Sequence, residues 1–183
     1  MPAPADVVDE ESLARAVISA LAGDGSTLAT AESLTGGWIG TTLTGVPGAS
    51  AVYRGGLITY ATELKATLAG VSAATLRRDG PVAASTAGEL ALGAARRCEA
   101  DWGLAVTGVA GPESQDGHPV GQVFVGIARR AGGPGGAGAA SQTEDVRVQE
   151  LALAGSRAEI RQATVVAALS LLLDAIEARR SAR

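Results

Sequence analysis

The residues that could carry chemistry begin with Ser33, in the run Ala-Glu-Ser-Leu-Thr-Gly-Gly at 31–37. A strand ending at this serine and opening into a helix would present a hydroxyl, free backbone amides and glycines that admit a ligand close to the main chain. The candidate binding residues are Thr35, Gly36 and Gly37. Such amides favour phosphate, or they could hold an oxyanion if the hydroxyl acts as a nucleophile. The alternative is that Ser33 is only a helix N-cap.

Lys65 is the second candidate, because it is the only lysine in a chain with 15 basic residues. An amine, unlike a guanidinium, can lose its proton near neutral pH. If a helix starts near Thr62, Lys65 falls in its first turn, where the helix dipole and partial burial would lower its pKa. A neutral amine could take a proton from a serine, with Tyr60 as a relay or hydrogen-bond partner. The alternative is a surface lysine paired with a carboxylate such as Glu63.

A third segment, Val-Thr-Gly-Val-Ala-Gly-Pro at 106–112, directly follows a predicted strand. Small residues at the carboxyl end of a strand in an α/β sheet let the backbone line a ligand crevice. The segment is not a P-loop, and the glycines at 36–37 do not complete a dinucleotide fingerprint. The candidate binding residues here are Thr107, Gly108, Ala110 and Gly111.

His118 and Cys98 receive simpler interpretations. His118 lies in a Gly-His-Pro loop with no motif that would orient it as a base, so it is predicted to be a solvated turn residue. Cys98 is predicted to be a small core residue inside a helix that starts at Ser85, because nothing around it indicates a lowered pKa.

Helices and strands alternate along the chain, which predicts how these residues are positioned. The predicted helices cover 12–21, 35–43, 62–68, two segments capped by Ser72 and Ser85, and a last helix from a capping box at Ser156 and Glu159 to about 178. The predicted strands cover 27–30, 57–60, 104–106, 120–128 and 146–153. This alternation favours a three-layer α/β/α sandwich with a central mixed sheet. We expect one domain over 1–183, with a flexible tail at 1–10 and a flexible Gly/Ala-rich surface loop at 131–140.

Composition excludes several classes of protein. No apolar run is long enough for a membrane span, and the start of the chain has neither the basic nor the apolar part of a secretory signal, so a cytoplasmic location is expected. One cysteine and one histidine argue against disulfides and a zinc site. A net charge of −4 and 3% aromatic residues argue against nucleic-acid binding. The apolar helix over 160–176 makes a homo-oligomer an expectation.

Taken together, the motifs resemble the CinA C-terminal domain family. The resemblance rests on 31–37, on Gly-Gly-Leu-Ile-Thr-Tyr-Ala with Lys65 at 55–65, on 106–112, on Pro-Val-Gly-Gln-Val at 119–123 and on Gly-Ser-Arg-Ala-Glu-Ile-Arg at 155–161. These segments occur in the family's order and span nearly the whole chain. Two differences are the 113–118 turn, Glu-Ser-Gln-Asp-Gly-His, and the larger N-terminal domain found in many relatives, so a stand-alone form is expected.

The resemblance implies a nicotinamide-nucleotide amidohydrolase, which converts nicotinamide mononucleotide (NMN) to nicotinate mononucleotide and ammonia without a cofactor or metal. It implies that Ser33 is the nucleophile, Lys65 the base and Tyr60 a supporting hydroxyl, and that the two glycine-rich segments line the nucleotide site. Arg54 is the expected phosphate partner, and Gly55 beside it is a further candidate binding residue. Two alternatives remain: a nucleotide-binding module that acts through protein partners, and an amidohydrolase for another amide.

Overall fold

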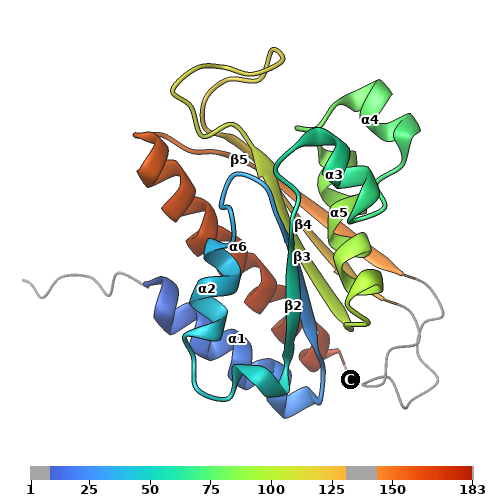
Figure 1. The fold of residues 1–183 in the computed structure, drawn as a ribbon. Coiled ribbons are helices and arrows are strands. Elements are labelled where there is room, and N and C mark those ends of the chain that lie inside the picture. Colours follow the sequence, from blue (N-terminus) through green and yellow to red (C-terminus); the bar gives the residue numbers. More distant parts are fainter. Residues whose placement is uncertain (1–8, 131–143, 183) are drawn as a thin grey trace, which may run out of the picture.

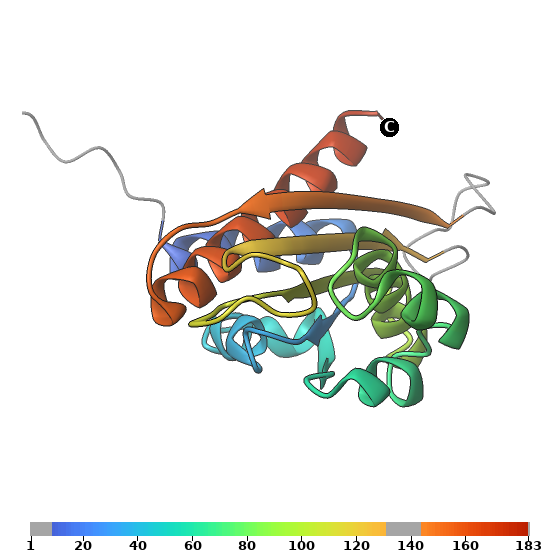
Figure 2. The same cartoon turned by 90° about the horizontal axis from the view of Figure 1, so that it is seen from above.

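A computed structural model describes residues 9–130 and 144–182, so the predicted loop at 131–140 and all but the end of the predicted tail lie outside the described residues. The described residues form a five-stranded sheet between two layers of helices (Figures 1 and 2). The predicted three-layer α/β fold is therefore confirmed. The helices are α1 (Glu10–Asp24), α2 (Trp38–Thr44), α3 (Thr62–Thr67), α4 (Ala73–Asp79), α5 (Ala84–Arg97) and α6 (Arg157–Ser181), with a 3₁₀ turn at Ala49–Ala51.

The sheet has the strand order β2-β1-β3-β4-β5. Its strands are β1 (Leu28–Glu32), β2 (Tyr53–Ile58), β3 (Trp102–Gly108), β4 (Gln122–Arg129) and β5 (Asp145–Ala152). The first three strands are parallel to one another, with β1 in the middle. β4 pairs antiparallel with β3, and β5 pairs antiparallel with β4, so the sheet is mixed as predicted. Because parallel strands end at the same edge, the segments after β1, β2 and β3 meet there.

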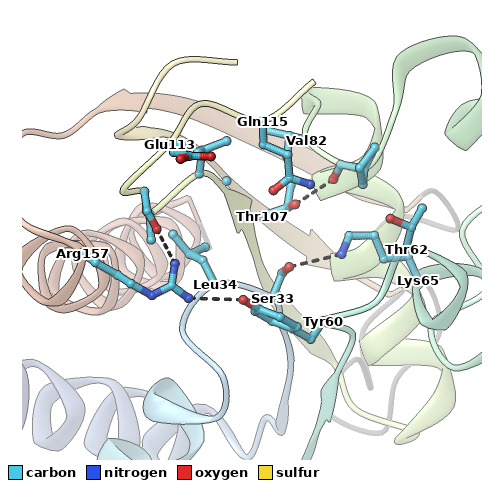
Figure 3. Close-up of a pocket in the computed structure, with 15 residues that line it drawn as sticks. Ser33, Leu34, Tyr60, Thr62, Lys65, Val82, Thr107, Glu113, Gln115 and Arg157 are labelled. Atoms are coloured by element: carbon cyan, nitrogen blue, oxygen red, sulfur yellow. Dashed lines mark hydrogen bonds between the residues drawn. The ribbon is translucent and has the colours of Figure 1, made fainter. Parts of the chain in front are cut away.

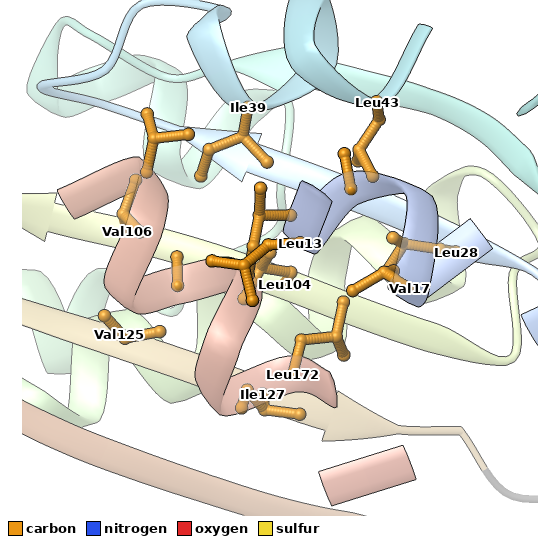
Figure 4. Close-up of a cluster of buried hydrophobic side chains, with 14 of the residues drawn as sticks. Leu13, Val17, Leu28, Ile39, Leu43, Leu104, Val106, Val125, Ile127 and Leu172 are labelled. Carbon is orange, nitrogen blue, oxygen red and sulfur yellow. The ribbon is translucent and has the colours of Figure 1, made fainter. Parts of the chain in front are cut away.

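The larger part of the core lies between the sheet and the layer formed by α1, α2 and α6 (Figure 4). Leu13 and Val17 of α1 and Leu172 of α6 pack against Leu28 and Leu104 of the sheet, and all five side chains are buried. Apolar spacing of three to four residues places these side chains on one face of each helix. This packing fixes α6 across the sheet, with its first turn near the edge where β1, β2 and β3 end (Figure 1).

On the opposite face, α5 lies very close to the sheet because the contact is made by glycine and alanine. A Cβ on Gly103 of β3 would lie 1.8 Å from the carbonyl oxygen of Ala91, and one on Gly126 of β4 would lie 2.2 Å from that of Ala87. No side chain fits in such a gap. The α3 and α4 helices lie in the same layer as α5 (Figure 1).

The predicted element boundaries needed several corrections. The helix predicted from 35 begins only at Trp38, because Gly36 and Gly37 have φ values of 62° and 98°, outside the right-handed helical region. Ser85 is not a cap: α5 starts one residue earlier, and the Ser85 hydroxyl donates to Asp79 at 2.5 Å. The caps at Ser72 and at Ser156 with Glu159 are confirmed. No helix in 9–130 or 144–182 is long and apolar enough to cross a membrane.

Candidate active site

A cleft opens at the edge where β1, β2 and β3 end, and we call it the serine cleft (Figure 3). It encloses about 620 Å³ including its open mouth, within the range of small-molecule sites. Its walls come from the turn after β1, the segment from β2 into α3, the turn between α4 and α5, the end of β3 with the loop after it, and the first turn of α6. The lining residues are Ser33, Leu34, Tyr60, Thr62, Lys65, Pro81, Val82, Thr107–Ala110, Gly111, Glu113, Gln115 and Arg157.

Ser33 and Lys65 meet at the inner end of this cleft. The Lys65 Nζ lies 3.2 Å from the Ser33 Oγ and 2.6 Å from the carbonyl oxygen of Thr59. Lys65 is only 2% exposed and Ser33 8%, and no carboxylate in the described part of the chain forms an ion pair with Lys65. The sequence alternatives, a surface lysine paired with Glu63 and a serine that only caps a helix, are both wrong.

Burial lowers the pKa of Lys65 to about 8. Desolvation disfavours the charged ammonium, so a substantial fraction of the amine is neutral at weakly alkaline pH. The predicted direction of the shift is confirmed, but part of the predicted cause is wrong. Since α3 has only six residues, Lys65 lies in its last turn, where the helix dipole favours a cation. The pair therefore has the arrangement of an activated nucleophile: a hydroxyl beside an amine that can accept its proton.

Tyr60 lines the cleft but does not contact the pair in the predicted way. Its side chain is 61% exposed, and its hydroxyl accepts a hydrogen bond from Arg157 Nη2 at 3.2 Å. No hydrogen bond joins it to Lys65 or Ser33 among the described residues. The prediction of Tyr60 as a hydrogen-bond partner of Lys65 is therefore wrong, although Tyr60 forms part of the wall of the cleft (Figure 3).

The backbone amides after Ser33 are mostly engaged, against the prediction of a free anion site. The buried carboxylate of Glu32 accepts the amides of Gly37, Ile39 and Gly40 at 2.8–3.0 Å. The amide of Gly36 donates to the carbonyl oxygen of Ser33 at 3.1 Å. The N-terminus of α2 thus already holds a negative charge supplied by the protein, which satisfies its free N–H groups. A substrate phosphate cannot take the same amides.

The remaining predicted binding residues divide into three groups. Thr107, Gly108, Ala110 and Gly111 line the cleft as predicted. Thr35, Gly36 and Gly37 follow Ser33 but do not line it. Arg54 and Gly55 are at the beginning of β2, about 16 Å along the strand from Thr59, and Arg54 donates to the carbonyl oxygen of Cys98 at 3.2 Å. Arg54 is therefore not a phosphate partner in this cleft.

Arg157 is the main residue that sequence reasoning missed. It is the first residue of α6, and its guanidinium donates to the carbonyl oxygen of Gly111 at 2.6 Å and to Tyr60. No carboxylate among the described residues forms an ion pair with it. A cation in the first turn of a helix opposes the helix dipole, and this unfavourable position was the available signal. Glu113 and Gln115, in the 113–118 turn, complete the cleft.

The fold and the site define a class: an α/β protein with a buried serine–lysine pair at the carboxyl ends of parallel strands. The sequence profile of the family described as "CinA C-terminal domain" matches residues 10–176. The chain belongs to this family, and the resemblance noted in its sequence motifs is confirmed.

Two relatives illustrate the similarity in sequence. A "CinA-like protein" of Frankia casuarinae is 44% identical over 163 residues, which are 89% of this chain and 35% of the relative. A "putative competence-damage inducible protein" of Levilactobacillus brevis is 41% identical over 90% of this chain and 36% of its own length. The chain thus spans about a third of these curated relatives.

Solved structures match over nearly their full length. The competence/damage inducible protein CihA from Agrobacterium tumefaciens is 37% identical with a TM-score of 0.81, covering 92% of this chain and 96% of that one. A competence-damaged protein (CinA) superfamily protein from Enterobacter cloacae has a TM-score of 0.83 at 25% identity, covering 96% and 97%. The single α/β domain described here is therefore the family's fold.

Proposed function

We propose that this chain is an amidohydrolase that cleaves the carboxamide of NMN, with Ser33 as the nucleophile and Lys65 as the general base. The observation that carries the proposal is the 3.2 Å contact between the Ser33 Oγ and the buried amine of Lys65. Burial of a lysine that has no counter-ion among the described residues destabilises the folded protein, and a protein that only binds ligands gains nothing in return. Its lowered pKa instead suits proton transfer near neutral pH.

The reaction begins when the Ser33 oxygen attacks the carboxamide carbon while its proton passes to the neutral Lys65 amine. The carbonyl oxygen becomes an oxyanion that backbone N–H groups stabilise. The C–N bond then breaks, and the leaving NH₂ group takes the proton from Lys65 and departs as ammonia. Water attacks the resulting ester with Lys65 again as base, and the returning proton restores Ser33 as nicotinate mononucleotide leaves. The balance is one amide and one water consumed, and one acid and one ammonia formed.

The charges of the cleft support a mononucleotide rather than a simple amide. NMN carries an anionic phosphate and a cationic pyridinium ring. Arg157 supplies a guanidinium without a carboxylate partner in the described residues, and Glu113 supplies a carboxylate on the same cleft. We therefore assign the phosphate to Arg157, in place of Arg54, and place the ring on the side of Glu113.

The test is ammonia release from NMN by the purified protein without added metal. We expect turnover by the wild type and a loss of at least about 1,000-fold in Ser33→Ala, because removal of a nucleophile leaves only binding effects. Ser50→Ala, at an exposed serine that does not line the serine cleft, is the matched control and should match the wild type. Nicotinamide and nicotinamide riboside are assayed in parallel. A wild type that binds NMN without releasing ammonia would favour a nucleotide-binding module, and turnover of another amide would change the substrate.

A further inference from the structure

The turn that carries Ser33 is held by a residue far away in the sequence. Arg161 of α6 donates from Nε to the carbonyl oxygen of Leu34 at 2.9 Å and from Nη2 to that of Thr35 at 3.0 Å. Its guanidinium also lies over the ring of Trp38, 5.4 Å from the centroid. Arg161 does not line the serine cleft, so it cannot act on a substrate directly. Any effect on the reaction must pass through the turn.

The two carbonyls held by Arg161 fix the direction of two N–H groups. The peptide bonds that follow Leu34 and Thr35 are trans, so each N–H points away from the carbonyl of the same peptide. The N–H of Gly36 is thereby directed to the carbonyl oxygen of Ser33, at 3.1 Å. The Ser33 carbonyl held in this way fixes in turn the N–H on the other side of its trans peptide, which belongs to Leu34. The N–H groups of Leu34 and Thr35 meet no acceptor in the described part of the chain, although both residues are buried, and Leu34 lines the serine cleft.

A buried N–H without a partner is rare and unfavourable unless a ligand or a reacting group uses it. We propose that Arg161 is a positioning residue that holds this turn so that the N–H of Leu34, a residue that lines the cleft, stabilises the oxyanion formed when Ser33 attacks a carbonyl. The inference rests on the proposed function and deepens it. A donor fixed before the reaction needs no reorganisation as the charge develops.

The arrangement requires arginine in particular. Two carbonyl oxygens from successive peptides are held by two nitrogens of one planar guanidinium, whereas a lysine ammonium has a single nitrogen. On the other side of the turn, Glu32 holds the N–H of Gly37 at 3.0 Å. The serine turn is therefore restrained both through its carbonyls and through its amides.

The experiment compares Arg161→Met and Arg161→Lys with the wild type, and with Arg180→Met as a control on the same helix, where Arg180 pairs with Asp24. Two reactions are measured. The first is ammonia release from NMN. The second is acetylation of Ser33 by p-nitrophenyl acetate, which is measured by the release of nitrophenolate and by the mass of the acetylated protein, with Ser33→Ala as the blank. The ester forms the same kind of oxyanion but needs no nucleotide recognition.

We expect Arg161→Met to lower kcat about 10- to 100-fold with KM and nicotinate mononucleotide affinity unchanged, and to lower the acetylation rate by a similar factor. Arg161→Lys should fall between Arg161→Met and the wild type, and Arg180→Met should match the wild type. A merely structural role would instead lower the thermal midpoint and the folded fraction while leaving kcat per folded molecule unchanged. That result, or a change confined to KM, overturns the inference.

The two proposals fail separately. If the wild type acetylates Ser33 but releases no ammonia from NMN, the amidohydrolase proposal fails, and the acetylation rates of the Arg161 variants still decide the inference. If Ser33 is not acetylated in the wild type, no functional oxyanion site exists and the inference is overturned. The inference is also overturned if Arg161→Met lowers kcat for NMN but leaves the rate of Ser33 acetylation unchanged.

Discussion

Lys65 donates a shorter hydrogen bond to the carbonyl oxygen of Thr59, at 2.6 Å, than to the hydroxyl of Ser33, at 3.2 Å. A carbonyl only accepts, so one N–H of Lys65 stays on Thr59 whether the amine is charged or neutral. The neutral amine can then direct its lone pair towards Ser33. Thr59 directly follows β2, so the end of this strand sets the orientation of the base.

The activity should follow the protonation of Lys65. Because burial lowers its pKa to about 8, kcat/KM should rise with pH and level off above this value. The measurement is ammonia release from NMN between pH 6 and 10. Lys65→Arg should lose nearly all activity at every pH, because a guanidinium stays protonated. A flat profile between pH 7 and 9 would contradict the role of Lys65 as base.

The same shift makes stability depend on pH. The pKa of Lys65 falls from 10.5 to about 8 on folding, so the unfolded chain binds more protons between these values and the free energy of unfolding rises with pH across this window. Relative to Lys65→Met, the wild type should gain up to about 3 kcal/mol between pH 8 and 10.5. Urea unfolding of both proteins at several pH values measures the difference. A constant difference would show that the amine is not desolvated.

Glu32 should be essential for the local fold, because it accepts three backbone N–H groups at the start of α2. Glu32→Ala should lower the free energy of unfolding by about 3 kcal/mol, since these three amides lose a buried, charged acceptor. Glu63→Ala, at an exposed carboxylate of α3, is the control and should change it by less than about 0.5 kcal/mol. Equal effects of the two substitutions in urea unfolding would contradict this role.

Arg157 should act on the phosphate. Arg157→Met is expected to raise KM for NMN about 10- to 100-fold, the loss typical of one charged hydrogen-bonding group. KM for nicotinamide riboside, which lacks the phosphate, should change little. Steady-state kinetics on both substrates measures the effect. An equal rise for both would indicate that Arg157 shapes the cleft through Gly111 and Tyr60 instead.

The close contact of α5 with the sheet can be tested at Gly103. Gly103→Ala would bring a Cβ to 1.8 Å from the carbonyl oxygen of Ala91, so the helix must move away and the protein should lose more than about 3 kcal/mol of stability or fail to fold. Gly23→Ala in α1 is the control, because its Cβ would lie 3.6 Å from the Arg180 side chain. It should be neutral or stabilising. Thermal unfolding of both variants decides the point.

Local patterns predicted much of this fold and part of the site. The strand-to-turn geometry at Ser33 and the capping box at Ser156 were correct because they depend on neighbouring residues. The burial of Lys65 and the approach of Arg157 to Tyr60 depend on packing between distant segments, which no local pattern reports. Arg54 was misplaced for a related reason. It is near the cleft residues in sequence, but an extended strand separates it from them in space.

The unique lysine gives the molecule a built-in chemical reporter. Apart from the α-amino group of the chain, Lys65 is the only amine, and it is 2% exposed. Amine-selective reagents small enough to enter the cleft therefore address a single side chain, and an isotope label introduced with lysine marks one position only. Its nuclear magnetic resonance signal would report the protonation state of the site directly, free of overlap with any other lysine.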